Sequence, residues 1–185
     1  MQLGDLDVIL IDGRSGSGKT SLTERLVTRQ RLDGGRIQVL HVEDLYPGWD
    51  GLAAGSRSVA TALDAGGYRR YDWHAEKFGD WIALTTDRPL VIEGCGAVTA
   101  ENLAAARRWA EGISGTASPA RVHAVWLDGS AELRRGRALA RDGETFRPHW
   151  ERWAAQEDRL FARTQPETLA DEIIRIEEPA RGPVD

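Results

Sequence analysis

One eight-residue segment constrains the fold of this chain more than any other feature. Residues 13–20 match the pattern G-x-x-x-x-G-K-[ST] at every specified position. The apolar run at 6–12 predicts a buried strand before the segment, and the spacing of apolar residues at 21–31 predicts a helix after it. A strand, a glycine-rich loop and a helix in this order form a phosphate-binding loop. A dinucleotide-binding fingerprint is excluded, because Ser21 stands where its third glycine is required.

The chemistry of such a loop explains its residue types. Glycines allow successive backbone N–H groups to point inward at phosphate oxygens, and the following helix adds its positive N-terminal end. Lys19 supplies a positive charge for the β- and γ-phosphates, and the Thr20 hydroxyl can bind Mg²⁺. ATP or a close relative, with Mg²⁺, is therefore the expected ligand. The residues expected to contact it are Gly13, Ser15, Gly16, Ser17, Gly18, Lys19, Thr20 and Ser21.

Predicted strands and helices alternate along the rest of the sequence. Further strands are predicted at 36–42, 89–93, 121–127 and 170–176. Helices are predicted at 58–65, 75–85, 100–111, 131–141 and 148–163, with a break at 142–143. This alternation predicts an α/β fold in which helices cover both faces of a parallel sheet. No repeat or linker divides the sequence, so one domain over 1–185 is expected, with a frayed end at 177–185.

Composition narrows the class of protein. The formal net charge is -5, which disfavours nucleic acid as a partner, and no apolar run is long enough to cross a bilayer. Cys95 is the only cysteine, which excludes an intramolecular disulfide and suits a cytoplasmic protein. Asn102 is the only asparagine and Leu103 follows it, which excludes the Asn-Lys-x-Asp motif of GTPases. No Leu-Ser-Gly-Gly-Gln stretch of ABC ATPases occurs, so a compact kinase for a small acceptor is favoured.

Three acidic residues follow predicted strands and are candidates for the reaction itself. Glu43 and Asp44 end the second strand, and Glu93 ends the third. Ligands of open α/β sheets bind beyond the carboxyl ends of the strands. Phosphoryl transfer needs one carboxylate to accept the proton of the acceptor hydroxyl and another to hold Mg²⁺. The alternatives are a solvated acidic loop at 43–44 and a helix cap at Glu93.

Several short motifs occur in the same order as in uridine kinase-like proteins, which the sequence resembles from Val8 to Ile176. They are the phosphate loop, the acidic end of the second strand with Tyr46, the segment Tyr71-Asp72-Trp73-His74, the Glu93-Gly94 strand end, and the helix with Arg137 and Arg141-Asp142. The resemblance implies a nucleoside or a similar hydroxyl compound as the acceptor, and ATP with Mg²⁺ as the donor. It also implies a P-loop kinase fold with five parallel strands in the order 2-3-1-4-5, and it associates Glu93 with Mg²⁺.

The general base remains open between two residues. In uridine kinases the base is an Asp three residues before a Tyr, and counting back from Tyr46 reaches Glu43 rather than Asp44. Either Glu43 takes the role with a longer side chain, or Asp44 takes it. A short carboxylate beside the turn is held more rigidly, which slightly favours Asp44.

The acceptor site is predicted from one short segment and from aromatic residues. The segment at 71–74 resembles the Phe-Asp-His segment with which uridine kinases hold the sugar hydroxyls. Asp72 is therefore expected to bind a diol, and His74 to donate or accept a hydrogen bond. The alternative is that Asp72 caps a helix that begins near His74. The aromatic side chains that can face a planar ring are Tyr46, Trp49 and Trp73.

Three arginines are spaced to share one face of the helix predicted at 131–141. Arg134, Arg137 and Arg141 lie at i, i+3 and i+7. Inward-facing arginines repel one another unless anions lie between them. A helical lid that neutralises the transferred phosphoryl group is therefore expected at about 130–147, with Arg137 and Arg141 acting in the transfer and Arg134 contacting the nucleotide. The alternative is a solvated face balanced by nearby acids.

Two other functions remain open from the sequence. A nucleotide-binding regulator with little transfer activity would explain the departures from the family pattern at Glu43 and Trp73. A nucleoside monophosphate kinase would need basic residues at its acceptor site, and Arg57, Arg69 and Arg70 are available for that role.

Overall fold

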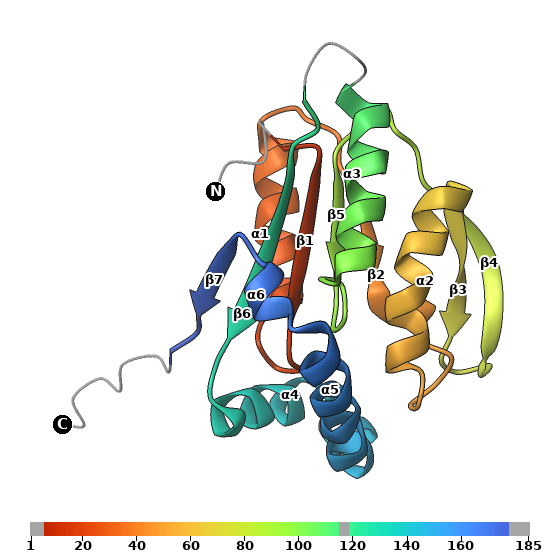
Figure 1. The fold of residues 1–185 in the computed structure, drawn as a ribbon. Coiled ribbons are helices and arrows are strands. Elements are labelled where there is room, and N and C mark those ends of the chain that lie inside the picture. The colour runs from red at the N-terminus through yellow and green to blue at the C-terminus, as the bar shows by residue number, and fades with distance from the viewer. Residues whose placement is uncertain (1–5, 115–118, 178–185) are drawn as a thin grey trace.

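A five-stranded sheet forms the centre of the computed structural model, which describes residues 6–114 and 119–177 (Figure 1). Every neighbouring pair of strands is parallel, in the order β2-β5-β1-β6-β7. Counted along these five strands the order is 2-3-1-4-5, so the predicted sheet and its order are confirmed. The strands are β1 (Val8–Gly13), β2 (Gln38–His41), β5 (Leu90–Glu93), β6 (Val122–Asp128) and β7 (Glu172–Arg175).

Helices cover both faces of this sheet, as predicted. Along β1, successive side chains point to opposite faces. Ile9 packs with Leu22 and Leu26 of α1 (Lys19–Leu32), whereas Leu10 belongs to the larger cluster on the other face. That cluster includes residues of α2 (Leu52–Ala65) and α3 (Ala100–Ser114). Because β1 is covered on both faces, it reads in the sequence as a continuous apolar run.

Helices α4 (Ala131–Phe146) and α5 (Trp150–Thr164), joined by the short 3-10 helix η4 (Arg147–His149), lie beyond the carboxyl ends of the central strands, next to the phosphate loop (Figure 1). The short helix α6 (Pro166–Leu169) follows α5 and lies against β6. The hydroxyl of Ser130 caps α4 by accepting a hydrogen bond from the N–H of Leu133 at 3.2 Å. Gly143 interrupts α4 with φ 55° and ψ -133°, where the break was predicted. These helices bring the arginine-bearing segment to the site end of the sheet.

A β-hairpin replaces the helix that was predicted at 75–85. β3 (Gly67–Asp72) pairs antiparallel with β4 (Lys77–Ala83), and β3 packs against α2 and the 3-10 helix η2 (Val42–Leu45). The helix prediction was wrong because it ignored two features of β4. Gly79 disfavours a helix, and the aromatic side chains of β4 favour a strand. The chain also turns between the strands with Glu76 at φ 50°, a conformation that no regular helix contains.

The remaining expectations concern the chain end and membranes. Of the frayed end predicted at 177–185, residues 178–185 lie outside the described residues. Among helices within 6–114 and 119–177, none has the length and apolar character needed to span a membrane.

Candidate active site

The phosphate loop follows β1 in a conformation that depends on its glycines. Gly13, Gly16 and Gly18 have φ values of 148°, 80° and 86°, which other residues rarely adopt. Space is also restricted, because a Cβ atom on Gly16 would overlap the carbonyl group of Arg134. One on Gly13 would lie 2.6 Å from the carbonyl oxygen of Leu127. Both backbone conformation and packing therefore require glycine at positions 13 and 16, whereas backbone conformation alone favours it at Gly18.

Lys19 lies buried within the loop that it completes. Its Nζ donates hydrogen bonds to the carbonyl oxygens of Gly13 at 2.8 Å and Arg14 at 3.2 Å, and it lies 3.4 Å from Cys95 Sγ. Burial alone would lower the pKa of Lys19, but acidic groups around it, Cys95 and Glu93 among them, raise the pKa above its ordinary value. The lysine is therefore held as a cation at the position where phosphates bind.

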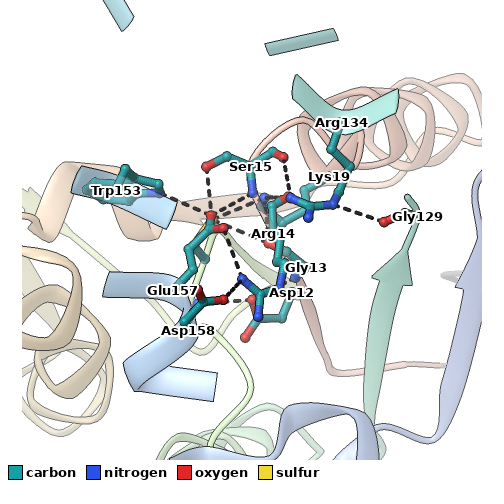
Figure 2. A network of polar contacts seen from close by, with 12 residues as sticks. Asp12, Gly13, Arg14, Ser15, Lys19, Gly129, Arg134, Trp153, Glu157 and Asp158 are labelled. Atoms are coloured by element: carbon teal, nitrogen blue, oxygen red, sulfur yellow. Dashed lines mark hydrogen bonds and ion pairs between the residues drawn. The ribbon is translucent and has the colours of Figure 1, made fainter. Parts of the chain in front are cut away.

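The Ser15 peptide is held from both sides by the last helices (Figure 2). Its N–H donates to Oε1 of Glu157 in α5 at 2.7 Å, and its carbonyl accepts from Nη1 of Arg134 in α4 at 3.2 Å. Arg134 Nε also donates to the carbonyl of Gly129 at 3.0 Å, and Trp153 Nε1 donates to Glu157 Oε1 at 3.1 Å. Both Arg134 and Glu157 are buried. Arg134, predicted to contact the nucleotide, here supports the loop that would bind it.

An ion pair adds a second link between the loop and α5. Arg14 Nη1 lies 2.6 Å from Asp158 Oδ1 and 3.7 Å from Glu157 Oε2, and its guanidinium lies 5.3 Å from the ring centre of Phe161. Glu157 was not predicted from the sequence. Its partner Ser15 lies 142 positions earlier in the chain, and no local pattern marks such a pair.

Asp12, which the sequence analysis also missed, ties the phosphate loop to the loop that follows β5. Its carboxylate accepts hydrogen bonds from the N–H groups of Gly13 at 2.7 Å, Gly96 at 3.0 Å and Val98 at 2.8 Å. Burial raises the pKa of Asp12 to about 7, although these hydrogen bonds act in the opposite direction. An acidic residue at the end of an apolar strand, directly before a glycine, was the available signal.

The main cavity, of about 630 Å³, opens beside the phosphate loop. It brings together eleven of the predicted site residues. They are Ser15, Gly16, Gly18, Lys19, Thr20, Glu43, Tyr46, Trp49, Trp73, Glu93 and Arg141. Cys95, Thr145, Phe146 and Trp153 complete its lining.

A second cavity, of about 460 Å³, lies on the other side of the loop between α1, α4 and the segment of β7. It shares Gly16, Gly18 and Arg141 with the main cavity. Of the predicted residues, Ser17, Ser21 and Arg137 line this second cavity instead of the main one. Arg137 Nη2 also donates to the carbonyl of Glu177 at 3.2 Å. The arginine stripe is therefore divided: Arg134 supports the loop, Arg137 faces the second cavity, and Arg141 lines both.

The two candidate bases occupy different surroundings. Glu43 lines the main cavity, and burial together with the neighbouring Glu93 raises its pKa. Asp44 does not line that cavity, and its Oδ2 accepts a hydrogen bond from the Tyr68 hydroxyl of β3 at 3.1 Å. Burial raises the pKa of Asp44 as well, while the Tyr68 hydrogen bond opposes the shift. The geometry thus brings Glu43, rather than Asp44, to the lining of the main cavity.

Glu93 and Thr20 are the residues predicted to associate with Mg²⁺, and both line the main cavity. Glu93 Oε1 lies 2.6 Å from Nδ1 of His41, its register partner on β2. This hydrogen bond raises the pKa of His41. A buried carboxylate and a hydroxyl beside a phosphate loop fit Mg²⁺, which binds one or two protein oxygens together with nucleotide phosphates.

Five aromatic side chains line the main cavity, and we call them the aromatic wall: Tyr46, Trp49, Trp73, Phe146 and Trp153. The centre of the Trp49 ring lies 5.1 Å from Trp73, 5.6 Å from Phe146 and 6.3 Å from Trp153. Tyr46 and Trp153 meet edge to face at 5.1 Å. The wall combines the chain after η2, the hairpin turn, and the end of α4 with α5.

Asp72 and His74 do not line the main cavity, although Trp73 between them does. Asp72 Oδ1 accepts hydrogen bonds from the N–H groups of His74 and Ala75, both at 2.9 Å. It therefore caps the hairpin turn, and no helix begins there. Both residues line a separate hollow on the hairpin, together with Arg70.

Comparisons with known proteins support the fold. No protein-family model and no curated protein sequence matches this chain. A possible uridine kinase from Bacillus stearothermophilus superimposes with a TM-score of 0.54 at 20% identity, over 91% of this chain and 88% of the other. An uncharacterized protein from Eubacterium ventriosum superimposes with a TM-score of 0.46 at 12% identity, over 91% of this chain and 87% of the other. The APS kinase of Mycobacterium tuberculosis, in complex with AMPPNP and APS, superimposes with a TM-score of 0.40 at 17% identity, over 97% of this chain and 84% of the other.

The first of these similarities carries the structural conclusion. Its TM-score above 0.5 over most of both chains shows that this protein has the α/β fold of P-loop kinases. The other two superpositions are too loose to carry an argument.

Proposed function

We propose that this protein is an ATP-dependent phosphotransferase that moves the γ-phosphoryl group to a hydroxyl of a small acceptor. A nucleoside is the acceptor suggested by the uridine kinase resemblance. One observation carries the proposal: a single cavity is lined both by Lys19 and Thr20 and by Glu43 and the aromatic wall. A donor phosphate and an acceptor hydroxyl can therefore meet within it.

The donor end offers what a nucleoside triphosphate needs. Backbone N–H groups and Lys19 would bind the β- and γ-phosphates, and Arg141, which lines the same cavity, would neutralise charge on the transferred group. The second cavity adjoins the same glycines, and it offers room for the nucleoside part of ATP. Thr20 and Glu93 would hold Mg²⁺, which when bound would offset the charge of the phosphates.

The chain's own groups then account for the transfer. The acceptor oxygen attacks the γ-phosphorus while the bond to the bridging oxygen of ADP breaks, and the proton of the acceptor hydroxyl passes to Glu43. A raised pKa makes Glu43 a stronger base than an ordinary carboxylate, provided that it is ionised at the working pH. Glu43 is preferred to Asp44 because it lines the cavity, whereas Asp44 is bonded to Tyr68.

The structure disfavours a nucleoside monophosphate kinase. Arg57, Arg69 and Arg70 were the basic residues available for an acceptor phosphate, but all three are exposed and none lines the main cavity. Arg69 donates to the carbonyl of Gly79 across the hairpin at 3.0 Å.

The proposal is tested by measuring ATP consumption with and without a panel of nucleosides, nucleotides and sugars. We expect consumption to depend on one acceptor class and to require Mg²⁺. Tight ATP binding without consumption in the presence of any acceptor would instead indicate a nucleotide-binding regulator.

A further inference from the structure

The acceptor end of the main cavity has its own chemistry, distinct from that of the phosphate loop. We propose that it selects an alcohol with a flat aromatic or heteroaromatic body and no anionic group, and that it recognises one hydroxyl rather than a diol. This inference rests on the proposed transfer function, because it names the acceptor class of the same site.

Ring surface is what the aromatic wall offers to an acceptor. The Tyr46 hydroxyl already donates to the carbonyl of Cys95 at 2.7 Å, and the Trp153 indole N–H donates to Glu157. These two polar atoms therefore face protein partners. Trp73, 37% exposed, lies at the open side of the wall, its ring tilted by 60° to that of Trp49. A flat acceptor gains stacking energy from such rings, whereas an open polyol finds few groups to bond.

The charges that line the cavity oppose an anionic acceptor. The basic residues that line it are Lys19 and Arg141, and the proposed transfer function assigns both to the donor phosphates. Glu43 and Glu93 add two carboxylates to the same lining. A phosphate on the acceptor would be placed beside carboxylates and ring faces, where it would lose its hydration without gaining a cation.

Diol recognition also lacks its carboxylate. Asp72 lies outside the cavity, and the same oxygen atom accepts two N–H groups of the hairpin turn. Asp44 is bonded to Tyr68 and does not line the cavity either. Glu43 and Glu93 do line it, but Glu93 bonds His41 and is assigned to Mg²⁺, and the proposed mechanism assigns Glu43 to the hydroxyl that reacts. A carboxylate of the cavity can therefore hold one hydroxyl of the acceptor, and no further carboxylate is left to bind a neighbouring hydroxyl.

The inference is tested by binding and turnover of matched acceptors. Calorimetry with Mg²⁺ and a non-hydrolysable ATP analogue would compare uridine, 2′-deoxyuridine, pyridoxine, uridine monophosphate and glucose, and ATP consumption would be measured in parallel. We expect a ring-bearing alcohol to bind best, and uridine and 2′-deoxyuridine to agree within about twofold because no hydrogen bond is lost. Uridine monophosphate and glucose should bind at least about tenfold more weakly than the best ring-bearing alcohol.

Two tryptophans on the hairpin supply a matched pair of variants. Trp73→Leu should weaken the binding of a ring-bearing acceptor by about tenfold, since one aromatic contact is lost. Trp81→Leu is the control, because Trp81 is 51% exposed on β4 and does not line the main cavity. Neither variant should change the affinity for the ATP analogue. Equal acceptor affinities in the two variants would overturn the role of the wall.

Other outcomes separate this inference from the transfer function. Preference for glucose or for uridine monophosphate, or failure of every ring-bearing alcohol to bind, would overturn the inference. A preference of tenfold or more for uridine over 2′-deoxyuridine that disappears in Asp72→Ala would do the same. Binding of ring-bearing alcohols without ATP consumption would refute the transfer function and leave the acceptor class standing.

Discussion

The two ends of the main cavity are built in different ways. The phosphate-loop end consists of backbone N–H groups and a lysine, and buried side chains hold it from several directions: Asp12, Arg134 and Glu157. The proposed acceptor end, the aromatic wall, consists of side chains from three segments that meet through ring contacts around Trp49. A phosphate-binding end of this kind suits any nucleoside triphosphate. The acceptor end can change its chemistry by single substitutions, so it is where proteins of this fold can differ.

Lys19→Ala should produce the largest effect, because it removes the charge aimed at the transferred group. We expect the transfer rate to fall by about 10²–10³-fold or more. The fold should be retained, since Nζ contacts loop carbonyls rather than the apolar core. Turnover and thermal unfolding would be measured together. Lys77→Ala, on the exposed face of β4, is the control, and equal turnover in the two variants would remove the phosphate-loop assignment.

Removing the base should come next in size. Glu43→Gln should lower kcat by about 10²–10⁴-fold while ATP binding survives, because proton acceptance is lost but the cavity is not. Asp44→Asn should lower kcat by less than about tenfold, since its carboxylate bonds Tyr68. Steady-state kinetics of the two variants decide the matter. A larger decrease of kcat in Asp44→Asn than in Glu43→Gln would show that Asp44 is the general base. Small decreases in both variants would show that neither residue is the general base.

The support beneath the phosphate loop should depend on pH through Asp12. The pKa of about 7 in the folded protein lies above the ordinary value of 3.8. The folded state therefore binds this proton more tightly than the unfolded state does. The free energy of unfolding should accordingly fall as pH rises from about 4 to about 7, by up to roughly 4 kcal/mol.

Denaturant unfolding at several pH values across this window measures that effect. Asp12→Asn should remove the contribution, whereas Asp33→Asn, at an exposed position, should keep it. Identical pH slopes in the wild type and in Asp12→Asn would show that Asp12 does not titrate there.

Glu157→Ala should weaken the support of the phosphate loop without changing the residues proposed to bind the acceptor. It leaves the N–H groups of Ser15 and Trp153 without their acceptor, which costs about 1–3 kcal/mol each. We expect about tenfold weaker ADP binding and a lower unfolding temperature. Glu157→Gln keeps an acceptor oxygen and should be milder. Glu151→Ala, exposed on the same helix, is the control, and unchanged ADP affinity in Glu157→Ala would contradict the support of the loop.

Asp72→Ala should have the smallest effect on activity. Acceptor kcat/KM should change by less than about twofold, because the carboxylate bonds the hairpin turn rather than the cavity. A slight decrease of the unfolding temperature is expected from the lost turn cap. A marked loss of activity with ribonucleosides alone would restore the diol role that the sequence suggested.

Local sequence predicted the donor end well and the hairpin badly. The phosphate loop spans eight contiguous residues, and its strand, helix and glycines are all visible in the sequence. The strand positions followed from apolar runs, and their order from the family resemblance. The segment 75–85 was predicted as a helix because its glycine and its aromatic residues were given too little weight.

Sequence alone determined that this chain carries a phosphate loop at the carboxyl edge of a parallel sheet. The groups expected to bind phosphate are backbone N–H groups and a lysine within one short segment. The glycine conformations and the apolar burial of the strand before it are likewise local properties of the sequence. Tertiary structure alone decided that Glu43 rather than Asp44 faces the cavity, that Asp72 does not, and that Glu157 holds Ser15 from 142 positions away. Each of these depends on which distant segment packs against the residue. No single stretch of sequence encodes such contacts, because their free energy arises only when both segments are in place.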